Sequence, residues 1–476
     1  MNKKISDVKI ISVIVVFCSA VYLSLVWNSN VWMDEAFTAS LAHHSFKEVI
    51  YLSMMDTLPP LYNIILWLTT SIFGYTVPVM KITSVLPMIG VMIIAATTLR
   101  KRFNLVTASS FILLITAMPL MLNYGVEIRM YSLGFLFATA SGIFCYEVIC
   151  ESTFKNWALF TVFSVLAGYS HHFAFVAVGF VYLFLLLYYF FLDRKHIKRW
   201  FICLGFTILL YLPCLIVTLT QFSRVSGYFT MPDITLSLFI QYVLYPYIVG
   251  ITPATCLCIL LMFACLLYTA YTLFVKKDYS LITIYSLACF AIYYGVLIFG
   301  TIVCKIMTAN IFVDRYLFFS TGLLWMIVAI TIGRLSKNYQ QWAMISLIFI
   351  LGICSYIVEF KVEYSNSADE EIAFLDENVS YGDIFYGFGG HEERENCIPF
   401  LSLLGEGNDL TFVYPLDNAL ETANKLNVTL WISIIDNYEL SSEEKAMIDN
   451  AGYDIEEASD FKFDRYDCKL YKLVRK

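Results

Sequence analysis

The chain has 476 residues, of which 59% are hydrophobic and 14% charged, and its mean hydropathy is +0.71. Soluble proteins carry about 25% charged residues, so the composition excludes a soluble globular protein and indicates a polytopic membrane protein surrounded by lipid, with no nucleic-acid partner. Residues 1–360 hold 21 basic and 13 acidic residues, whereas residues 361–476 hold 10 basic and 25 acidic residues. We therefore predict a transmembrane domain at 1–362 and an acidic soluble domain at 363–476.

Apolar runs of the kind that span a membrane as α-helices recur along the first domain. Eleven are predicted, near residues 8–27, 78–99, 105–122, 132–150, 156–169, 173–192, 200–219, 253–275, 280–301, 316–333 and 341–360. The first run is longer than the apolar core of a signal peptide and lacks a cleavage site, so we expect it to remain as a helix.

One further apolar segment, residues 59–74, is short and interrupted by polar residues. If it lies at the interface, 15 Lys and Arg residues fall on the N-terminal side of the membrane and only five on the other side. If it spans, this asymmetry is lost. Because basic loops stay in the cytoplasm, we predict eleven spans, a cytoplasmic N-terminus and an extracytoplasmic C-terminal domain in the cell membrane.

The first external loop carries the candidate catalytic acids. Asp34 and Glu35 follow the first span in "NVWMDEAF", and Asp56 precedes "PPLY", in which Tyr62 is a candidate substrate contact. Carboxylates at a membrane edge are costly unless they are paired or used. The alternatives are a solvated loop for the acid pair and a helix cap or turn for Asp56.

The segment "NYGVEIRMYSLGF" (123–135) places more polar residues at the outer end of a span. Arg129 is a candidate for binding a phosphate, and Glu127 and Tyr131 are candidates for binding a sugar. An ion pair between Glu127 and Arg129 that only satisfies itself is the alternative.

Four further residues complete the external set. His171 and His172 in "YSHHFAF" are candidate substrate contacts, because no third residue at a diagnostic spacing makes them a metal site. Arg315 in "DRYLFF" and Lys81 in "MKITSVLP" are candidate phosphate ligands. The alternatives are structural histidines and a basic side chain that anchors a helix end by reaching the interface.

The acidic C-terminal domain alternates helical and extended patterns, which predicts a small α/β layer. We predict helices at 368–379, 417–426 and 441–452, and strands at 383–388, 410–416, 428–435 and 468–474. "GFGGHE" (387–392) departs from a dinucleotide-binding loop and indicates a turn. Cys397 and Cys468 are the two cysteines of this domain, and sequence alone does not show whether they pair.

The order of these motifs resembles that of the GT-C membrane glycosyltransferases. It is most similar to bacterial members of the family of dolichyl-phosphate-mannose–protein mannosyltransferases and aminoarabinose lipid A transferases, a glycosyltransferase family 39-like pattern. The resemblance covers about residues 8–335 and is carried by "WMDEAFTASLA", "DTLPPLYNIILW", "MKITSVLP", "YGVEIRMYSLGF", "YSHHFAF" and "DRYLFF".

The resemblance implies a sugar transferase that uses a polyprenyl-phosphate-linked donor. It implies an essential acid at the Asp34 position, as a base or acceptor-orienting group, and cations such as Lys81 and Arg315 at the donor phosphate. Two positions depart from the pattern. Lys81 stands where relatives often have Arg, which removes bidentate binding, and Asp56 stands where relatives have varied polar residues.

Together these features predict an inverting glycosyltransferase that acts outside the cytoplasm on a protein hydroxyl, a cell-wall polymer or a lipid glycan. A transporter or flippase for lipid-linked glycans is one alternative, although it would place charges near mid-membrane. A polysaccharide polymerase is the other. No cofactor is predicted with certainty and a divalent cation remains possible, while the sugar, the acceptor and the oligomeric state stay open.

Overall fold

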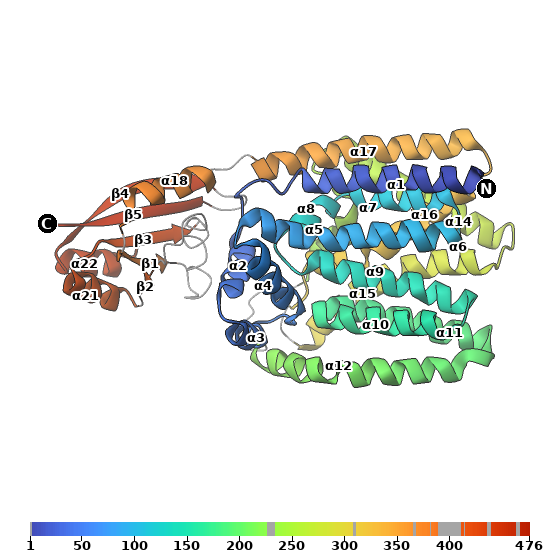
Figure 1. The fold of residues 1–476 in the computed structure, drawn as a ribbon, viewed down its shortest axis with the longest axis horizontal. Coiled ribbons are helices and arrows are strands. Elements are labelled where there is room, and N and C mark those ends of the chain that lie inside the picture. The colour runs from blue at the N-terminus through green and yellow to red at the C-terminus, as the bar shows by residue number, and fades with distance from the viewer. Residues whose placement is uncertain are drawn as a thin grey trace. The chain divides into compact units, whose positions relative to one another are not determined.

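The computed structural model describes residues 2–225, 234–307, 311–364, 368–380, 382–388, 411–413, 415–435, 439–462 and 467–476. Most of them are helical, and a small mixed sheet is formed in the C-terminal part of the chain (Figure 1). The predicted turn beyond Phe388 and the thiol of Cys397 lie outside the described residues.

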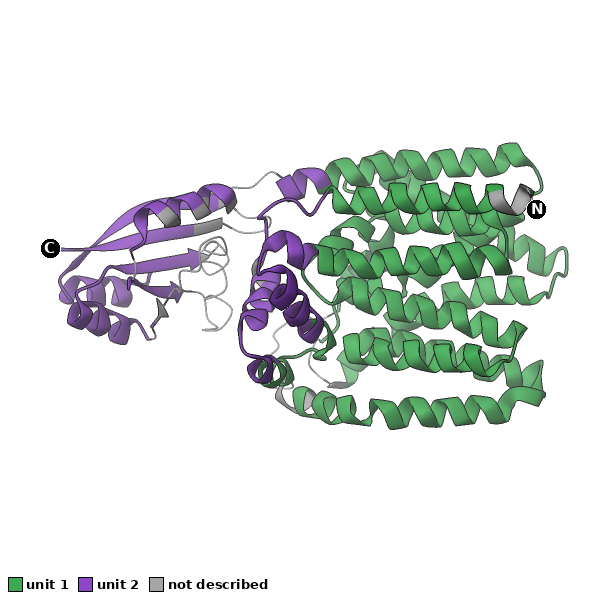
Figure 2. Ribbon diagram, viewed as in Figure 1, with its two compact units in different colours: residues 1–24, 50–62, 82–359 green, residues 25–49, 63–81, 360–476 purple. Residues whose placement is uncertain are grey.

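The chain divides into two compact units (Figure 2). Unit 1 comprises Met1–Ser24, Ile50–Tyr62 and Ile82–Glu359, and unit 2 comprises Leu25–Val49, Asn63–Lys81 and Phe360–Lys476. Unit 2 therefore combines parts of the first loop with the acidic C-terminal segment. The division into domains at 362/363 stays a prediction.

Unit 1 is a helical bundle. Its helices, two of which extend into unit 2, are α1 (Asn2–Leu23), α5 (Val77–Ile94), the π-helical turn η1 (Ala95–Leu99), α6 (Arg100–Arg102), α7 (Leu105–Ala117), α8 (Met121–Val126), α9 (Tyr131–Cys150), α10 (Phe154–Ser170), α11 (His172–Phe191), η2 (Arg194–His196), α12 (Ile197–Val225), α13 (Leu236–Leu244), η3 (Tyr245–Tyr247), α14 (Thr252–Phe274), α15 (Leu281–Met307), η4 (Asp314–Leu317), α16 (Phe318–Arg334) and α17 (Asn338–Tyr364).

Nine helical segments in the described part of the chain are long and apolar enough to cross a membrane. They are α1, α5 with its continuation, α9, α11, α12, α14, α15, α16 and α17, and they match nine of the eleven predicted spans. Of the other two, α10 has 17 residues, at the lower limit for a span. The segment predicted to lie at the interface forms α4 (Leu61–Phe73), whose 13 residues are too few to span.

The predicted span at 105–122 needs a correction, because it is not one continuous helix: α7 stops at Ala117 after 13 residues, and α8 follows from Met121. Thirteen residues make about 20 Å of helix, short of a hydrocarbon core of about 30 Å. Pro119 is the physical reason, since a residue before proline is forced out of the helical region, and Met118 is extended. Leu120 then adopts a positive φ of 68°, and the chain turns into α8.

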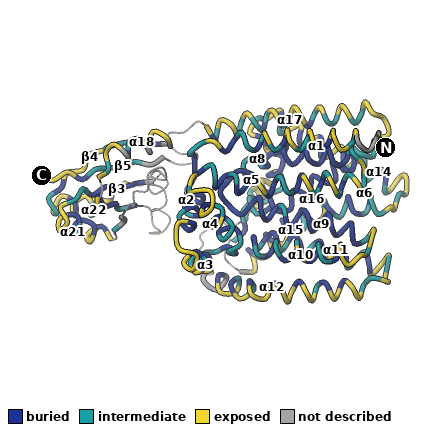
Figure 3. Tube along the Cα trace, in the orientation of Figure 1, coloured by how far each residue is buried: buried dark blue, intermediate teal, exposed yellow. Residues whose placement is uncertain are grey.

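The core of unit 1 is built around α16, which is buried from Phe318 to Ile332 (Figure 3). Small residues let α9 and α16 approach closely. A Cβ added at Gly142 of α9 would overlap Leu323 of α16, and one added at Gly322 of α16 would overlap Thr139 of α9. This reciprocal packing is typical of helices in membranes, where close backbone contact replaces the hydrophobic driving force.

Ion pairs join the helix ends at one end of unit 1, the end at which the N-terminus lies (Figure 1). Arg102 binds Glu147 through two nitrogens, at 2.7 and 2.6 Å, and Glu151 at 2.9 Å. Arg334 pairs with Asp278. The contacts join the predicted basic loops in two pairs, 99–103 with 151–157 and 276–277 with 333–337, as the eleven-span interpretation requires. The orientation of that end across the membrane stays a prediction.

In the first loop, unit 2 contains α2 (Met33–His43), the first turn of α3 (Phe46–Met55) and most of α4. Side-chain hydrogen bonds hold these segments together. The Trp67 indole donates to the His44 carbonyl at 3.1 Å, and the Tyr75 hydroxyl donates to the Ala39 carbonyl. The loop is therefore a folded structure and not a solvated linker.

The C-terminal segment forms the predicted small α/β domain. Its helices are α18 (Ala368–Asn378), α21 (Leu416–Leu426) and α22 (Ser442–Asn450), and its strands are β1 (Ile384–Phe388), β2 (Thr411–Phe412), β3 (Leu430–Ile435), β4 (Tyr453–Lys462) and β5 (Asp467–Arg475). The sheet order is β2-β1-β3-β5-β4. Strand β1 is parallel to both of its neighbours, β2 and β3, whereas β5 is antiparallel to both of its neighbours, β3 and β4. Every predicted helix and strand is present, although β2 has only two residues.

Sequence analysis missed β4. Its sequence, YDIEEASDFK, is acidic and lacks a run of apolar residues. β4 lies at the edge of the sheet, where charged side chains are tolerated and protect the open edge. The pairing with β5 stabilises this strand, which its local sequence pattern does not predict.

Candidate active site

Unit 1 brings several of the predicted polar residues into one cluster, which begins in the turn between α8 and α9. The Arg129 amide donates to the Glu127 carbonyl at 2.6 Å, so the turn is tight, and both side chains are buried. Tyr131 opens α9 and is fully buried. Buried charges in a membrane protein need partners and mark functional sites by default.

Arg315 joins this cluster from a distant part of the chain. It lies in η4, where its amide donates to the Asp314 carboxylate at 2.7 Å, and this bond fixes the first turn. The charges of Arg315, Glu127 and Arg129 all act on the Tyr131 hydroxyl, which has no hydrogen-bond partner among the described residues. Two cations and one acid therefore act electrostatically on a buried phenol.

His171 stands at the corner between α10 and α11. Its Nδ1 accepts the Phe173 amide proton at 3.0 Å and caps α11, so the neutral ring carries its proton on Nε2. The ring stacks on Phe319 at a centroid distance of 4.3 Å and meets Tyr316 at 4.6 Å. Burial holds the pKa of His171 well below its ordinary value, and His172, Arg129 and Arg315 lower it further. His171 is therefore a neutral donor at physiological pH.

A cavity of about 300 Å³ adjoins the histidines. Its lining combines apolar side chains with neutral polar groups and consists of Thr57, Leu58, His171, His172, Phe173, Val176, Thr218, Gln221, Phe299, Val303, Ile311 and Tyr316. Gln221, which was not predicted as a site residue, lies at the end of the apolar segment of α12. Its amide nitrogen donates to the Ser53 and Leu58 carbonyls at 3.3 and 2.9 Å, so the orientation of the amide is defined.

Asp56 and Tyr62 also belong to unit 1. Asp56 follows the last turn of α3, is half-buried, and accepts a hydrogen bond of 3.3 Å from the Thr57 hydroxyl. The buried Tyr62 hydroxyl shares a hydrogen bond of 2.6 Å with Ser84 of α5. Tyr62 therefore has a packing role, and its predicted contact with substrate stays a prediction.

Unit 2 holds the first acid pair in the first turn of α2, where the helix dipole favours negative charge. The Glu35 carboxylate accepts the Trp32 amide proton at 3.0 Å, which caps the helix. Asp34 and Glu35 are both buried. Glu35 thus fixes the helix end that carries Asp34, and the catalytic roles of both acids stay predictions.

Lys81, also in unit 2, is 1% exposed. Its ammonium forms an ion pair with Glu363 and donates to the Asn28 side chain at 2.8 Å. Nearby, the side-chain amide of Asn30 donates to the Val362 carbonyl at 3.1 Å. Sequence analysis missed Glu363, because the acid lies 282 positions away at the end of the last span.

The described residues provide no group of three or more His, Cys, Asp or Glu side chains that could hold a metal ion. They therefore offer no ligand set for the predicted divalent cation, and a metal requirement stays a prediction. The polar cluster of unit 1 is instead suited to binding an anion through its arginines.

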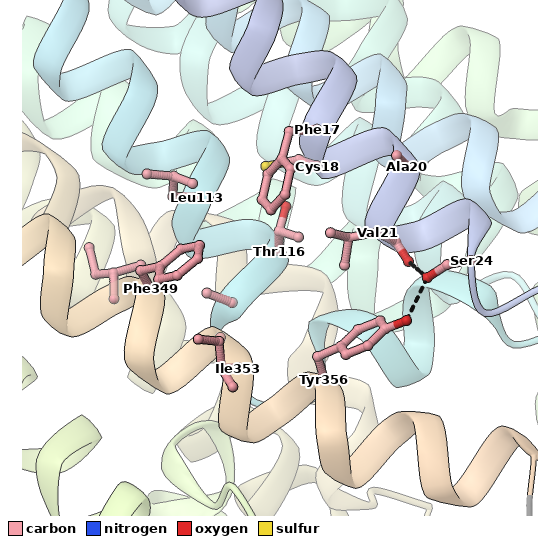
Figure 4. Close-up of a pocket in the computed structure, with 13 residues that line it drawn as sticks. Phe17, Cys18, Ala20, Val21, Ser24, Leu113, Thr116, Phe349, Ile353 and Tyr356 are labelled. Carbon is pink, nitrogen blue, oxygen red and sulfur yellow. Dashed lines mark hydrogen bonds between the residues drawn. The ribbon is translucent and has the colours of Figure 1, made fainter.

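A second cavity of unit 1 is of a different kind. It measures about 380 Å³, lies between α1, α7 and α17, and is lined mainly by apolar side chains such as Phe17, Leu113 and Phe349. At one end the Ser24 and Tyr356 hydroxyls share a hydrogen bond of 2.9 Å (Figure 4). This groove can accommodate hydrocarbon but offers no group for catalysis.

No known family model matches the sequence, and no curated protein matches it. Two solved structures are similar to the chain over almost its whole length. One is ArnT from Cupriavidus metallidurans bound to undecaprenyl phosphate, with a TM-score of 0.62, 10% identity, and coverage of 96% of this chain and 97% of that one. The apo state of the same ArnT gives a TM-score of 0.60 with the same identity and coverage.

At 10% identity this likeness concerns the fold. It confirms the predicted GT-C-like architecture, a multi-pass helical membrane domain followed by a small C-terminal α/β domain. The matched ArnT structure was solved with a polyprenyl phosphate bound, so the fold accommodates such a lipid in at least one protein.

Proposed function

We propose that this protein is a membrane glycosyltransferase that moves a sugar from a polyprenyl-phosphate-linked donor to an extracytoplasmic acceptor. The observation that carries the proposal is the cluster of unit 1, in which the buried Arg129 and the half-buried Arg315, which is distant in sequence, both act electrostatically on the buried Tyr131. The ArnT-like fold supports the same class of donor.

The two arginines are proposed to hold the donor phosphate. A guanidinium binds a phosphate through two parallel hydrogen bonds. When the sugar leaves, the phosphate gains a further negative charge, and fixed cations stabilise that charge as it develops. Lys81 is a proposed third ligand, and its ammonium would then exchange Glu363 for the phosphate.

Asp34 is proposed to be the base. As the acceptor hydroxyl oxygen attacks the anomeric carbon, Asp34 takes the hydroxyl proton. The bond between the anomeric carbon and the phosphate oxygen breaks, and its electron pair stays on the polyprenyl phosphate. A single displacement of this kind inverts the anomeric configuration. The cap that Glu35 makes to Trp32 keeps the first turn of α2 rigid.

The proposed topology places the N-terminus in the cytoplasm and the C-terminal domain outside. The acceptor is then a protein hydroxyl, a cell-wall polymer or a lipid glycan. A transporter or flippase for lipid-linked glycans is the second candidate and a polysaccharide polymerase the third. The transporter is less favoured because charged side chains gather at the helix ends, whereas a transporter would place them near mid-membrane.

The test uses purified full-length protein, a synthetic polyprenyl-phosphate-linked sugar and cell-envelope extract as acceptor. Asp34→Asn should lower sugar transfer at least about a hundredfold, the range for loss of a general base, and leave donor binding intact. Glu35→Gln should be milder. A residual rate for Asp34→Asn above about a tenth of wild type would contradict the role of Asp34.

Arg315→Ala should weaken donor binding about tenfold to a hundredfold, because a charge-assisted hydrogen bond contributes roughly 1.5–3 kcal/mol. Arg315→Lys should recover part of the loss. Arg334→Ala removes an arginine that is paired at the other end of unit 1 and serves as the control. Normal donor binding by Arg315→Ala would show that Arg315 only anchors the helix, and donor movement without transfer would favour the flippase.

A further inference from the structure

We propose that the cavity beside His171 is a carbohydrate subsite that takes an uncharged sugar ring and rejects a sugar carrying an ammonium group. The inference rests on the proposed function and identifies the class of its substrate. It starts from two residues that line the cavity: His171, whose Nε2 has no hydrogen-bond partner among the described residues, and Gln221, whose Oε1 makes no hydrogen bond of ordinary geometry and has the His172 ring beside it.

These atoms are costly where they lie. His171 and Gln221 are 1% and 2% exposed, and a buried polar atom without a partner costs about 1–3 kcal/mol. Both are fixed in direction. The bond that His171 Nδ1 accepts from Phe173 makes Nε2 a donor, and the bonds that the Gln221 nitrogen donates make Oε1 a pure acceptor. The cavity therefore presents a donor and an acceptor in defined positions.

Sugar hydroxyls match this set. Each hydroxyl both donates and accepts, so neighbouring hydroxyls of a single ring can satisfy a histidine N–H and an amide oxygen together. A hydrocarbon chain would leave these atoms without partners, and a phosphate would find no cation in the lining that the structure describes. The volume of about 300 Å³ lies at the lower end for small-molecule sites, which suits one ring.

Charge decides the class of sugar. No acidic or basic side chain is among the described lining residues, so an ammonium group would be buried without an opposite charge. The charges of Arg129 and Arg315 act on His171 and oppose a cation beside that ring. An uncharged sugar pays neither penalty.

Apolar side chains of the lining give the ring a second kind of contact. Phe173 and Tyr316 stack at a centroid distance of 5.3 Å, and Val303 and Phe299 of α15 also line the cavity. The negative faces of aromatic rings attract the weakly positive C–H edges of a neighbouring molecule. A lining that combines apolar surfaces with a few oriented polar atoms is typical of a small-molecule site.

The ring belongs either to the donor or to the acceptor glycan, and binding measurements distinguish the two. Full-length protein in nanodiscs is tested against undecaprenyl phosphate alone, against the same lipid phosphate carrying uncharged hexoses, and against the lipid phosphate carrying amino sugars. Wild type should bind at least one uncharged hexose donor about tenfold or more tightly than either of the other ligands.

Gln221→Leu should remove this gain and leave the affinity for undecaprenyl phosphate unchanged. Val303→Phe, which fills the cavity without removing a polar atom, should do the same, so the inference does not depend on one variant folding. Gln341→Leu removes a glutamine of α17 that donates to the Leu335 carbonyl and serves as the control.

If Gln221→Leu instead raises the KM for the acceptor about tenfold with donor binding unchanged, the ring is that of the acceptor. Unchanged donor affinity and acceptor KM in both variants would overturn the subsite. Equal binding of amino-sugar and uncharged donors by wild type would overturn the charge argument. A wild-type protein that binds none of these lipids would overturn the proposed function and the subsite together.

Discussion

The ion pair between Lys81 and Glu363 makes a strong prediction about stability. The Lys81 ammonium is almost completely buried and has Glu363 and Asn28 among its partners. Glu363→Leu removes the carboxylate and leaves the ammonium buried. Breaking a buried pair in this way costs about 3–5 kcal/mol, and we expect the lower end, because the hydrogen bond to Asn28 remains.

Two further variants separate charge from packing. Glu363→Gln keeps an acceptor and should cost less than Glu363→Leu. The double variant Lys81→Met/Glu363→Leu removes both charges and should return to within about 1 kcal/mol of wild type or exceed it, because a buried pair is often replaceable by apolar residues. The coupling energy of the double-mutant cycle measures the pair itself.

The measurement is denaturant or thermal unfolding of the full-length protein in detergent, followed by tryptophan fluorescence. Glu363→Leu should lower the midpoint by several degrees, and the double variant should restore it. If Glu363→Leu unfolds like wild type, the ammonium is not held by Glu363. If the double variant is no better than the single one, the loss comes from packing at the end of α17.

Two other predictions concern unit 1. The folded-state pKa of His171 lies below its ordinary value of 6.5, so below that pH the unfolded chain binds more protons, and the free energy of unfolding should fall on acidification by up to about 1.4 kcal/mol per pH unit. His171→Gln should flatten the dependence of the melting temperature on pH between pH 7 and 5. An unchanged slope would contradict the assignment. A Cβ added at Gly352 would lie 2.8 Å from the Cβ of Ala117, so Gly352→Ala should destabilise the bundle by about 1–3 kcal/mol. A Cβ added at Gly205 would meet nothing within 4 Å, so Gly205→Ala should be neutral or stabilising. Equal melting temperatures for the two variants would refute close packing of α7 and α17.

Local patterns were enough for much of the architecture. The spans could be predicted because a helix in lipid needs a long apolar run and nothing else from its surroundings. The alternation in the C-terminal domain could be predicted for a similar reason, since β3 is a continuous apolar strand and α22 begins with the capping pair Ser441 and Glu444. These signals lie within a few residues of the elements that they specify.

Other features were decided by contacts between distant residues. The edge strand β4 has no apolar pattern and is ordered by its pairing with β5. The break after α7 had a local signal in Pro119, but composition alone joined its two sides into one span.

The candidate site shows the same division. The sequence by itself determined which residue types lie at the helix ends, and it identified Arg129, His171 and Arg315 as a set. Only the tertiary structure decided that His171 donates through Nε2, that the Gln221 oxygen faces a cavity, and that Lys81 is held by Glu363. These properties depend on which buried group supplies the opposite half of a hydrogen bond or ion pair, and that group lies far away in the chain and close only in the folded protein.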